Sequence, residues 1–474
     1  MNCIYSSLSR TTSVMLAIVF VFITQRSFSQ MTLEVTSVPQ LTPLLDDVYV
    51  AGSFNNWNPS DENFKLTVQG NVWSVVIPAQ SEPAISFKFT RGTSWDTVEG
   101  SSVGSYIPDR TLSFENGTTQ QLQIAGWEDL AGNHTVTDNV RVLDMDFNIP
   151  QLNRTRRIWI TLPDGYDTST ETYPVIYMHD GQNLFSSATS FAGEWQVDEA
   201  VDSEYTSCVE PVIVVGIDNG GAARIDELAP WVNEEYNEGG EGALYSNFIV
   251  ETLKPFVDEN FRTKHEREHT AVGGSSLGAL ISMYMIAKHN DVFSKAALVS
   301  PAFWFNEEIT EYVQTHPLSA DSRLYFICGD SESGSMVGDM QQMYNVVANN
   351  QVPASNVAYQ VVAGGQHNEF YWSQQFPVIY STLFDCTVSV DDQTVEERFI
   401  LMPNPAGDTL EIRTKTNQLM NDIEIYSDDG KLIKSRNSIN DTYIQLNISE
   451  FASGTYFLKI KSGKTETTKA FLKK

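Results

Sequence analysis

The 474-residue chain contains little cysteine, with only four such residues. Cys3 lies before the first apolar run, so Cys208, Cys328 and Cys386 would remain if the N-terminus is removed. Three cysteines allow at most one disulfide bond and leave one free thiol. No CxxC motif occurs, and Cys and His do not cluster as metal ligands do. The sequence therefore predicts a fold held by packing, with no metal and no cofactor.

Basic residues are also scarce. The chain has 30 Lys and Arg residues against 60 Asp and Glu residues, which gives a formal net charge of −30. Such a surface repels polyphosphates and disfavours binding to nucleic acids or anionic membranes. The simplest role of the acidity is to maintain solubility. We therefore expect no nucleic-acid partner.

Long hydrophobic runs are missing as well. The apolar run from Val14 to Ile23 is too short to span a bilayer. It follows Arg10 and precedes small residues at Ser27–Ser29, as in a signal peptide. We predict a signal peptide over residues 1–29, a secreted or cell-surface protein and no membrane span. A buried N-terminal helix is the alternative.

Three regions then differ in pattern. Residues 30–125 contain short predicted strands separated by turn residues, which is typical of a small β-sandwich. Residues 140–386 alternate continuous apolar runs with helical patterns, which indicates a parallel sheet covered by helices. Residues 397–474 return to predicted strands. The predicted fold class is α/β, with the central domain flanked by two small all-β sandwich domains.

The sharpest motif is GSSLG at residues 274–278. A predicted strand, residues 269–273, precedes it, and a predicted helix follows it. This is the strand–turn–helix context of a nucleophile elbow, in which Ser276 would be the nucleophile. The amide of Leu277 would then point at the reacting carbonyl and stabilise an oxyanion. A glycine-rich helix start without chemistry is the alternative.

A serine nucleophile needs a base and, usually, a carboxylate. His367 follows the last predicted strand, residues 357–362, and precedes the last predicted helix. It is the predicted base, and His179 is its competitor. Asp330 and Glu332 both follow the penultimate predicted strand, so both are eligible as the acid. The chain order of serine, acid and histidine is that of α/β hydrolases.

A second oxyanion donor is expected after the strand that ends near His179. Gly181 allows an unusual backbone there, and the amide of Gln182 is the predicted donor. An ordinary turn is equally compatible with this sequence.

The central region resembles the esterase family of α/β hydrolases, which includes esterase D, enterochelin esterases, and feruloyl and acetyl xylan esterases. The matching stretches are Tyr177–Phe185, Gly193–Trp195, Gly274–Gly278, Ser300–Pro301 with Trp304, and Gly364–His367. The resemblance implies an α/β-hydrolase fold and places the acid at Glu332. By the same resemblance, Arg224 corresponds to a family arginine near the entrance of the active site. For Arg224 we favour a structural ion pair.

Residues 45–110 resemble carbohydrate-binding modules of the starch-binding type. The cues are Gly52–Pro59 and Phe87–Gly92. In such modules a tryptophan stacks on a sugar and a lysine donates hydrogen bonds, which implies roles for Trp57 and Lys88. Trp95 lies near the second stacking position but earlier than in the family pattern. An immunoglobulin-like spacer is the alternative to a glycan-binding module.

Residues 397–474 resemble the C-terminal sorting domain of the type IX secretion system. The cues are Pro403–Pro405, Ile425–Tyr426, Gly430, Gly454–Tyr456 and the terminal lysines. The resemblance implies that secretion machinery is a partner of this domain. A second adhesion sandwich is the alternative.

Together these features predict a secreted serine carboxylic-ester hydrolase that acts on acyl or feruloyl esters of carbohydrates through an acyl-enzyme. Its expected partners are a small-molecule or polysaccharide ester and a glycan bound by the N-terminal module. One alternative is a siderophore esterase of the enterochelin type. Another is an inert carbohydrate-binding or adhesion protein.

Overall fold

The computed structural model divides the chain into two compact units, residues 1–384 and residues 385–474, and each is described by itself. Within them the structure describes residues 30–70, 72–203, 209–385, 399–402, 405–414, 419–427, 431–462 and 465–474. The predicted signal peptide, Cys208, Cys386 and the sorting-domain cues Pro403, Asn404 and Gly430 lie outside these ranges. No helix among the described residues has the length and apolar character needed to cross a membrane.

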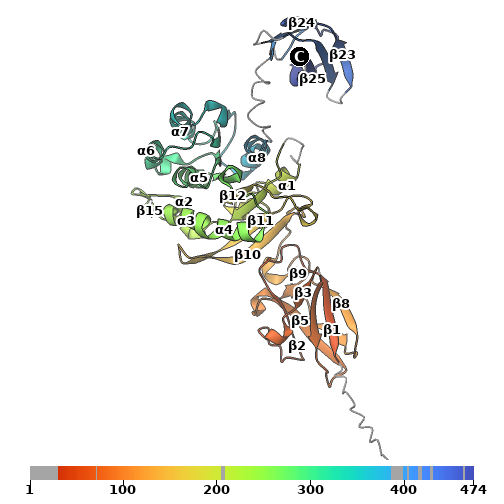
Figure 1. Cartoon of the computed structure of the whole chain (residues 1–474). Coiled ribbons are helices and arrows are strands. Elements are labelled where there is room, and N and C mark those ends of the chain that lie inside the picture. Colours follow the sequence, from red (N-terminus) through yellow and green to blue (C-terminus); the bar gives the residue numbers. More distant parts are fainter. Residues whose placement is uncertain are drawn as a thin grey trace, which may run out of the picture. The chain divides into compact units, whose positions relative to one another are not determined.

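The N-terminal module consists of short strands in three sheets, with orders β3-β4-β1-β8, β2-β5-β7 and β6-β9 (Figure 1). The strands are β1 (Met31–Ser37), β2 (Val48–Gly52), β3 (Thr67–Gln69), β4 (Val72–Ile77), β5 (Ala84–Arg91), β6 (Glu99–Gly100), β7 (Arg110–Ser113), β8 (Thr119–Gln123) and β9 (Gly126–Trp127). Alternate residues of β1, such as Leu33 and Val35, are buried against Phe87, Phe89 and Trp127. This period of two buries one face of each strand, as the sequence pattern indicates.

The hydrolase domain is built on one eight-stranded sheet of order β10-β11-β13-β12-β16-β17-β18-β19. The strands are β10 (Val140–Ile149), β11 (Arg154–Thr161), β12 (Val175–His179), β13 (Ile213–Ile217), β16 (Thr270–Ser275), β17 (Lys295–Val299), β18 (Arg323–Gly329) and β19 (Val357–Val362). Only β11 runs antiparallel to its two neighbours, and the pairs from β13 to β19 are all parallel. The predicted α/β-hydrolase fold class is therefore confirmed.

Helices cover both faces of this sheet (Figure 1). They are α1 (Val197–Ser203), α2 (Arg224–Leu228), α3 (Gly242–Phe248), α4 (Lys254–Asn260), α5 (Leu277–Lys288), α6 (Glu308–Thr315), α7 (Met336–Asn350) and α8 (Glu369–Leu383). One apolar core joins α3, α4, α5, α6 and α7 to one face of the sheet, and a second core joins α1 and α8 to the other. Because both faces are covered, the central strands are apolar throughout their length.

The segment between β1 and β2 of the module packs against the first strand of the hydrolase domain. Leu41 is buried in the core beneath α1 and α8. The amide of Leu44 donates to the Val142 carbonyl at 3.0 Å. The module is therefore tied to the edge of the hydrolase sheet by backbone pairing as well as by apolar contact.

The C-terminal unit is a β-sandwich of a three-stranded sheet, β20-β21-β24, and a four-stranded sheet, β23-β22-β25-β26. Its strands are β20 (Phe399–Met402), β21 (Thr409–Thr414), β22 (Asp422–Ser427), β23 (Leu432–Arg436), β24 (Tyr443–Asn447), β25 (Gly454–Ser462) and β26 (Thr465–Lys473). Ile412, Ile425 and Leu458 lie in the core between the sheets.

Candidate active site

Ser276 stands at the sharp turn between β16 and α5. Its backbone has φ 56° and ψ −118°, which a residue with a side chain rarely adopts and which costs on the order of 1–3 kcal/mol. The amide of Ser276 donates to the Val299 carbonyl at 3.0 Å, and the amide of Ala302 donates to the Ser276 carbonyl at 3.1 Å. These bonds from the segment around β17 hold the strained turn in place.

The glycines of the motif are required by close packing. A Cβ atom on Gly274 would lie 3.1 Å from the backbone of Gly278 and 3.1 Å from the ring of His179. A Cβ atom on Gly278 would lie 3.3 Å from the Cβ of His179. The strand and the helix can therefore approach closely enough to form the turn only without these side chains.

His367 follows β19 and pairs with Glu332. The Nδ1 atom of His367 lies 2.7 Å from Oε2 of Glu332, whose side chain is fully buried, while that of His367 is 38% exposed. Since Nδ1 faces the carboxylate, Nε2 is the nitrogen left free to exchange protons. The structure thus places the two predicted residues in direct contact.

Three further groups orient the Glu332 carboxylate. Its Oε1 atom accepts from the Gly329 amide at 2.6 Å and from the Ser300 hydroxyl at 2.8 Å. The indole of Trp372 donates to the same hydroxyl at 2.9 Å and meets the His367 ring edge-on. Sequence reasoning assigned no role to Trp372, although its position five residues after His367 in α8 is a usable signal.

Asp330, the other eligible acid, lies elsewhere. It is exposed, and its carboxylate accepts from the Gly364 amide at 2.7 Å. It therefore ties the end of β18 to the loop that carries His367, and the structure gives it no contact with the histidine.

Ser276 and His367 line one pocket of about 580 Å³. The structure gives no hydrogen bond between these two described residues. The other lining residues are Asp180, Gln182, Asn183, Phe191, Ala192, Asn219, Gly221, Arg224, Ser275, Glu369 and Trp372. A pocket of this size is typical of small-molecule sites.

Of the two predicted oxyanion donors, Gln182 lines this pocket, and Leu277 directly follows the lining residue Ser276. Leu277 is the first residue of α5, so its amide has no acceptor within the helix. Gln182 belongs to the short turn η5 (Gly181–Asn183) and lines the pocket. A Cβ atom on Gly181 would lie 2.7 Å from the Ile217 amide nitrogen, so only glycine lets this turn pack so closely against β13.

Arg224 and Asp180 form an ion pair on the pocket wall. The guanidinium donates to both carboxylate oxygens, at 2.6 and 2.8 Å. Burial alone would raise the pKa of Asp180, but the charge and hydrogen bonds of Arg224 outweigh it and lower that pKa. Arg224 thus makes the ion pair favoured by the sequence and also lines the pocket.

Glu369 is a buried carboxyl on the same wall. Its Oε1 atom accepts from the Asn183 side chain at 3.1 Å. Burial raises its pKa, and the nearby charge of Asp180 adds to this effect. Sequence reasoning passed over Glu369, and its place two residues after His367 is the only signal.

His179 is buried beneath the elbow and does not line the pocket. Its Nδ1 atom lies 3.0 Å from the Tyr245 hydroxyl. Burial lowers the pKa of His179 to about 4, so the ring is neutral at physiological pH. This position gives His179 a packing role under Gly274 and Gly278.

In the N-terminal module, Trp57 and Trp95 lie together with ring centroids 6.2 Å apart and planes tilted by 40°. Trp95 is 39% exposed. Lys88 differs from expectation because its side chain is buried. Its ammonium donates to the Ile107 carbonyl and lies over the Tyr106 ring.

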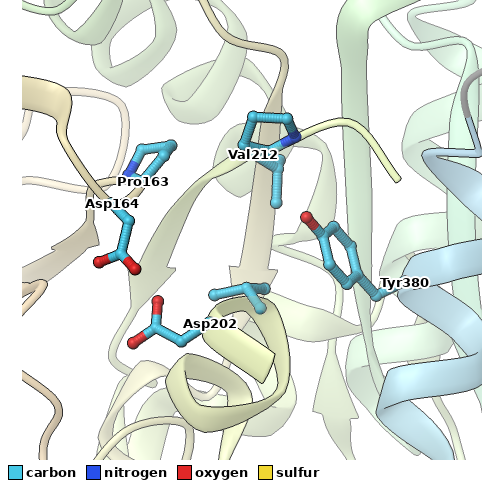
Figure 2. Close-up of a pocket in the computed structure, with 7 residues that line it drawn as sticks. Pro163, Asp164, Asp202, Val212 and Tyr380 are labelled. Atoms are coloured by element: carbon cyan, nitrogen blue, oxygen red, sulfur yellow. The ribbon is translucent and has the colours of Figure 1, made fainter. Parts of the chain in front are cut away.

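A second hollow in the hydrolase domain is lined by Pro163, Asp164, Val201, Asp202, Pro211, Val212 and Tyr380 (Figure 2). Its volume is about 10 Å³, which holds about one water molecule. It is therefore too small to receive an ester substrate.

The fold and the pocket define a hydrolase of the α/β-hydrolase class. Residues 149–383 match the family described as "Putative esterase", and this part of the chain belongs to that family. Residues 401–474 match the secretion system C-terminal sorting domain. The protein is thus an esterase-family hydrolase whose sorting domain directs it out of the cell or to the cell surface.

Relatives of the chain cover different parts of it. It is 24% identical over 234 residues to the uncharacterized protein YbbA of Bacillus subtilis (strain 168), which covers 47% of this chain and 89% of that protein. It is 40% identical over 95 residues to an alpha-amylase of Niallia circulans, and this match covers 20% of this chain and 7% of the amylase. It is 24% identical over 182 residues to an endo-1,4-beta-xylanase/feruloyl esterase of Xylanibacter ruminicola. This match covers 37% of this chain and 22% of that protein.

The chain thus spans less than a quarter of the amylase and of the xylanase/feruloyl esterase. Among solved structures, the BES protein from Bacillus cereus has a TM-score of 0.44 at 20% identity, covering 53% of this chain and 97% of that one.

Proposed function

We propose that the protein is a secreted serine esterase that works through an acyl-enzyme. The observation that carries the proposal is the strained Ser276 turn opening on the same pocket as the His367–Glu332 pair. Strained backbone at a residue that faces a pocket is typical of a catalytic group. We assign Ser276 as nucleophile, His367 as base and Glu332 as the acid that orients the histidine.

In this mechanism Ser276 Oγ attacks the ester carbonyl carbon while Nε2 of His367 takes its proton. The amides of Leu277 and Gln182 donate to the oxyanion that forms. The carbon–oxygen bond to the alcohol then breaks, and the alcohol leaves with the proton from His367. Water, deprotonated by His367, attacks the acyl-enzyme and releases the acid and free Ser276.

For the substrate, we propose an acyl or feruloyl ester of a carbohydrate. Phe191 is 94% exposed and lines the pocket, and Trp372 lines it as well. Exposed aromatic side chains at a pocket gain most by covering a ring of the substrate. The relative named as a xylanase/feruloyl esterase supports the same class.

We also propose that the N-terminal module holds the enzyme on glycans. The tilted Trp57–Trp95 pair offers a partly exposed aromatic surface. The segment shared with the alpha-amylase has 95 residues, about the length of this module. Lys88 contributes less than the sequence suggests, because its ammonium is already hydrogen-bonded within the module.

The proposal is tested by trapping the acyl-enzyme. The mature protein is mixed with p-nitrophenyl acetate and quenched within the burst of nitrophenol, and the acetylated peptide is found by mass spectrometry. We expect one acetyl group per chain, on Ser276. Acetylation elsewhere, or hydrolysis without a covalent intermediate, would contradict the mechanism.

A panel of acetyl, feruloyl and short-chain aryl esters, together with a catecholate siderophore lactone, then identifies the substrate. We expect the highest kcat/KM with a feruloyl or acetyl sugar ester. A preference for the lactone would favour the siderophore alternative, and no turnover of any ester would favour an inert binding protein.

A further inference from the structure

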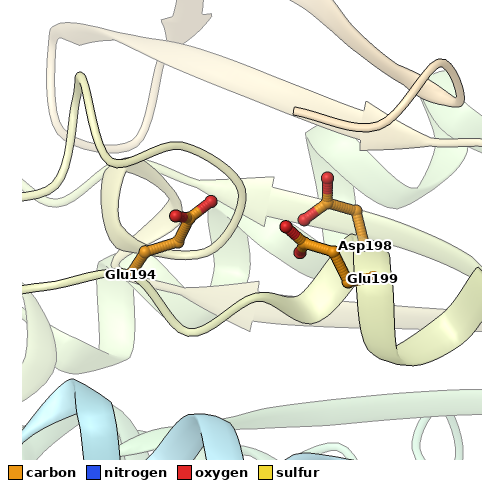
Figure 3. A group of neighbouring side chains, drawn as sticks. All are labelled: Glu194, Asp198 and Glu199. Atoms are coloured by element: carbon orange, nitrogen blue, oxygen red, sulfur yellow. The ribbon is translucent and has the colours of Figure 1, made fainter. Parts of the chain in front are cut away.

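Three carboxylates form a cluster at the start of α1, away from the residues assigned to catalysis. One ligand oxygen of each of Glu194, Asp198 and Glu199 lies within 4.8 Å of the other two. Figure 3 shows the carboxylates of Asp198 and Glu199 turned toward one another, with that of Glu194 facing them. Oxygens bound at about 2.4 Å from a common Ca²⁺ lie at such separations.

The negative charge of the cluster has no basic partner. Among the described residues, no lysine or arginine forms an ion pair with Glu194, Asp198 or Glu199. The Thr135 hydroxyl donates to Glu194 at 2.8 Å, and the Thr137 amide donates to Asp198 at 2.8 Å. Among the residues that the structure describes, the cluster therefore lacks a basic neighbour that would offset its charge.

A second observation concerns one buried oxygen. The Asp198 side chain is fully buried, and its Oδ2 atom accepts from the Thr137 amide. Its Oδ1 atom is also buried and accepts no hydrogen bond, and the same holds for Oε2 of Glu199. Buried carboxylate oxygens without a donor are costly and rare, because most find a partner. These two oxygens therefore have no hydrogen-bond donor among the described residues.

We propose that Glu194, Asp198 and Glu199 bind a calcium ion. Three carboxylates with only oxygen donors suit a hard cation, whose remaining positions water can fill. Mg²⁺ fits less well because it requires a near-ideal octahedron and sheds water reluctantly. The absence of histidine and cysteine from the cluster disfavours zinc.

The position of the cluster gives the ion a structural role. Glu194 ends the loop that carries Phe191 and Ala192 into the catalytic pocket, whereas Asp198 and Glu199 belong to α1. A shared cation would fasten that loop to the helix. It would also fasten it to the chain segment at Thr135 and Thr137 that leads into β10.

The test uses the mature full-length protein with Ca²⁺ as the probe, in 150 mM NaCl to screen general attraction to the acidic surface. We expect calorimetry to find one Ca²⁺ per chain. A saturating concentration should raise Tm by roughly 3–8 °C, and EGTA should reverse the rise. Tb³⁺ should bind at the same site, with emission sensitised by the adjacent Trp195 and displaced by Ca²⁺.

Variants assign the site. Asp198→Asn with Glu199→Gln keeps the shape of the cluster, and should remove the calorimetric signal, the Tm rise and the Tb³⁺ emission. The matched control is Glu234→Gln with Glu235→Gln, an exposed acidic pair of the same domain, which should behave as wild type.

No saturable Ca²⁺ binding by the wild-type protein would overturn the proposal, as would equal binding by the cluster variant. Since every readout is independent of ester turnover, the outcome does not depend on the proposed esterase activity.

Discussion

The N-terminal module and the catalytic edge of the hydrolase sheet both bury charged groups, but they use them differently. In the module, buried Arg91 pairs with Asp46 and Asp129, and buried Glu99 pairs with Arg110. Each charge is neutralised inside the module. At the hydrolase edge, buried Glu332 pairs instead with His367, which reaches into a pocket.

The two regions differ further in their histidines, but not in having strained backbone, since the module has positive φ at Asn56 and Trp57. In the hydrolase domain, one residue with strained backbone is Ser276, which lines the pocket at the end of a buried strand. All seven histidines of the chain lie at position 134 or later, so the module has no base of this kind. A buried ion pair therefore indicates function only when one partner continues to an exposed reactive group. Otherwise it serves the fold.

The sharpest test of this contrast is Ser276→Ala. We expect kcat on an aryl ester to fall by at least about 10⁴-fold with Tm unchanged, because the side chain supplies the nucleophile and little packing. Steady-state kinetics and circular dichroism check both parts. Activity within tenfold of wild type would remove Ser276 from the mechanism.

The next test separates the two acids. Glu332→Gln should lower kcat by roughly 10²–10⁴-fold, because His367 loses the carboxylate that orients it. Asp330→Asn is the matched control, and should change kcat less than threefold, because Asp330 bonds only to the loop backbone and to Ser331. The reverse ranking would transfer the role to Asp330. Equal small effects would indicate a serine–histidine dyad.

The central sheet could be predicted from sequence because apolar runs buried on both faces leave a strong signal. The predicted strand at 357–362 matches β19, and the predicted helix after the GSSLG motif matches α5. The strands β10 and β11 escaped prediction, since β11 carries Arg154, Arg156 and Arg157 among its apolar residues. Those arginines pair with Glu227, Glu241 and Asp218, which lie far away in the chain.

The candidate site was predictable where local chemistry requires a residue, as in the glycines beside Ser276 and the loop of His367. Contacts between residues that lie far apart in the sequence could not be predicted. The bond from Ser300 to Glu332 and the ion pair of Asp180 with Arg224 depend on which loops meet at the sheet edge. The burial of Lys88 also escaped prediction, because the motif shows the residue but not the Ile107 carbonyl that its ammonium meets.

A third test uses pH. Burial lowers the pKa of His179 from about 6.5 in the unfolded chain to about 4. Between these values the unfolded state binds more protons, so this stabilisation is complete above pH 6.5 and is lost as the pH falls toward 4. From pH 7 to 5 the loss is about 2 kcal/mol.

The measurement is the difference in unfolding free energy between wild type and His179→Asn, from unfolding in urea. Taking this difference removes the contribution that other titrating groups, such as Asp198, make to the pH dependence of both proteins. The difference should shrink as the pH falls from 7 to 5. A difference that is the same at both pH values would show that His179 is not held neutral in the fold.

A smaller effect is expected at the aromatic pair of the module. Trp57→Ala should weaken binding to a starch-type polysaccharide about tenfold, and Trp95→Ala should act similarly, because each removes a stacking surface. Depletion assays with insoluble polysaccharide measure this. Turnover of a soluble aryl ester should not change. Tyr106→Ala is the matched comparison, and a larger effect from it would move the binding face to the Lys88 side.

The smallest effect is expected when the β domains are removed altogether. Every residue assigned to catalysis lies between Gln182 and His367, so a protein of residues 135–390 should retain kcat/KM on a soluble aryl ester within about threefold. Activity on an insoluble polysaccharide should fall further, because a tethered enzyme works at a higher effective concentration.

The contact between the module and β10 sets the control for this truncation. Removing Leu41 opens the core beneath α1 and α8, and removing Leu44 leaves the Val142 carbonyl without its donor. Stability should therefore fall even where activity does not. A protein of residues 39–390 restores that segment and should regain part of the lost Tm. If the shorter protein is folded by circular dichroism yet inert on the soluble ester, the module shapes the catalytic pocket. The separation between a binding module and a catalytic edge would then be wrong.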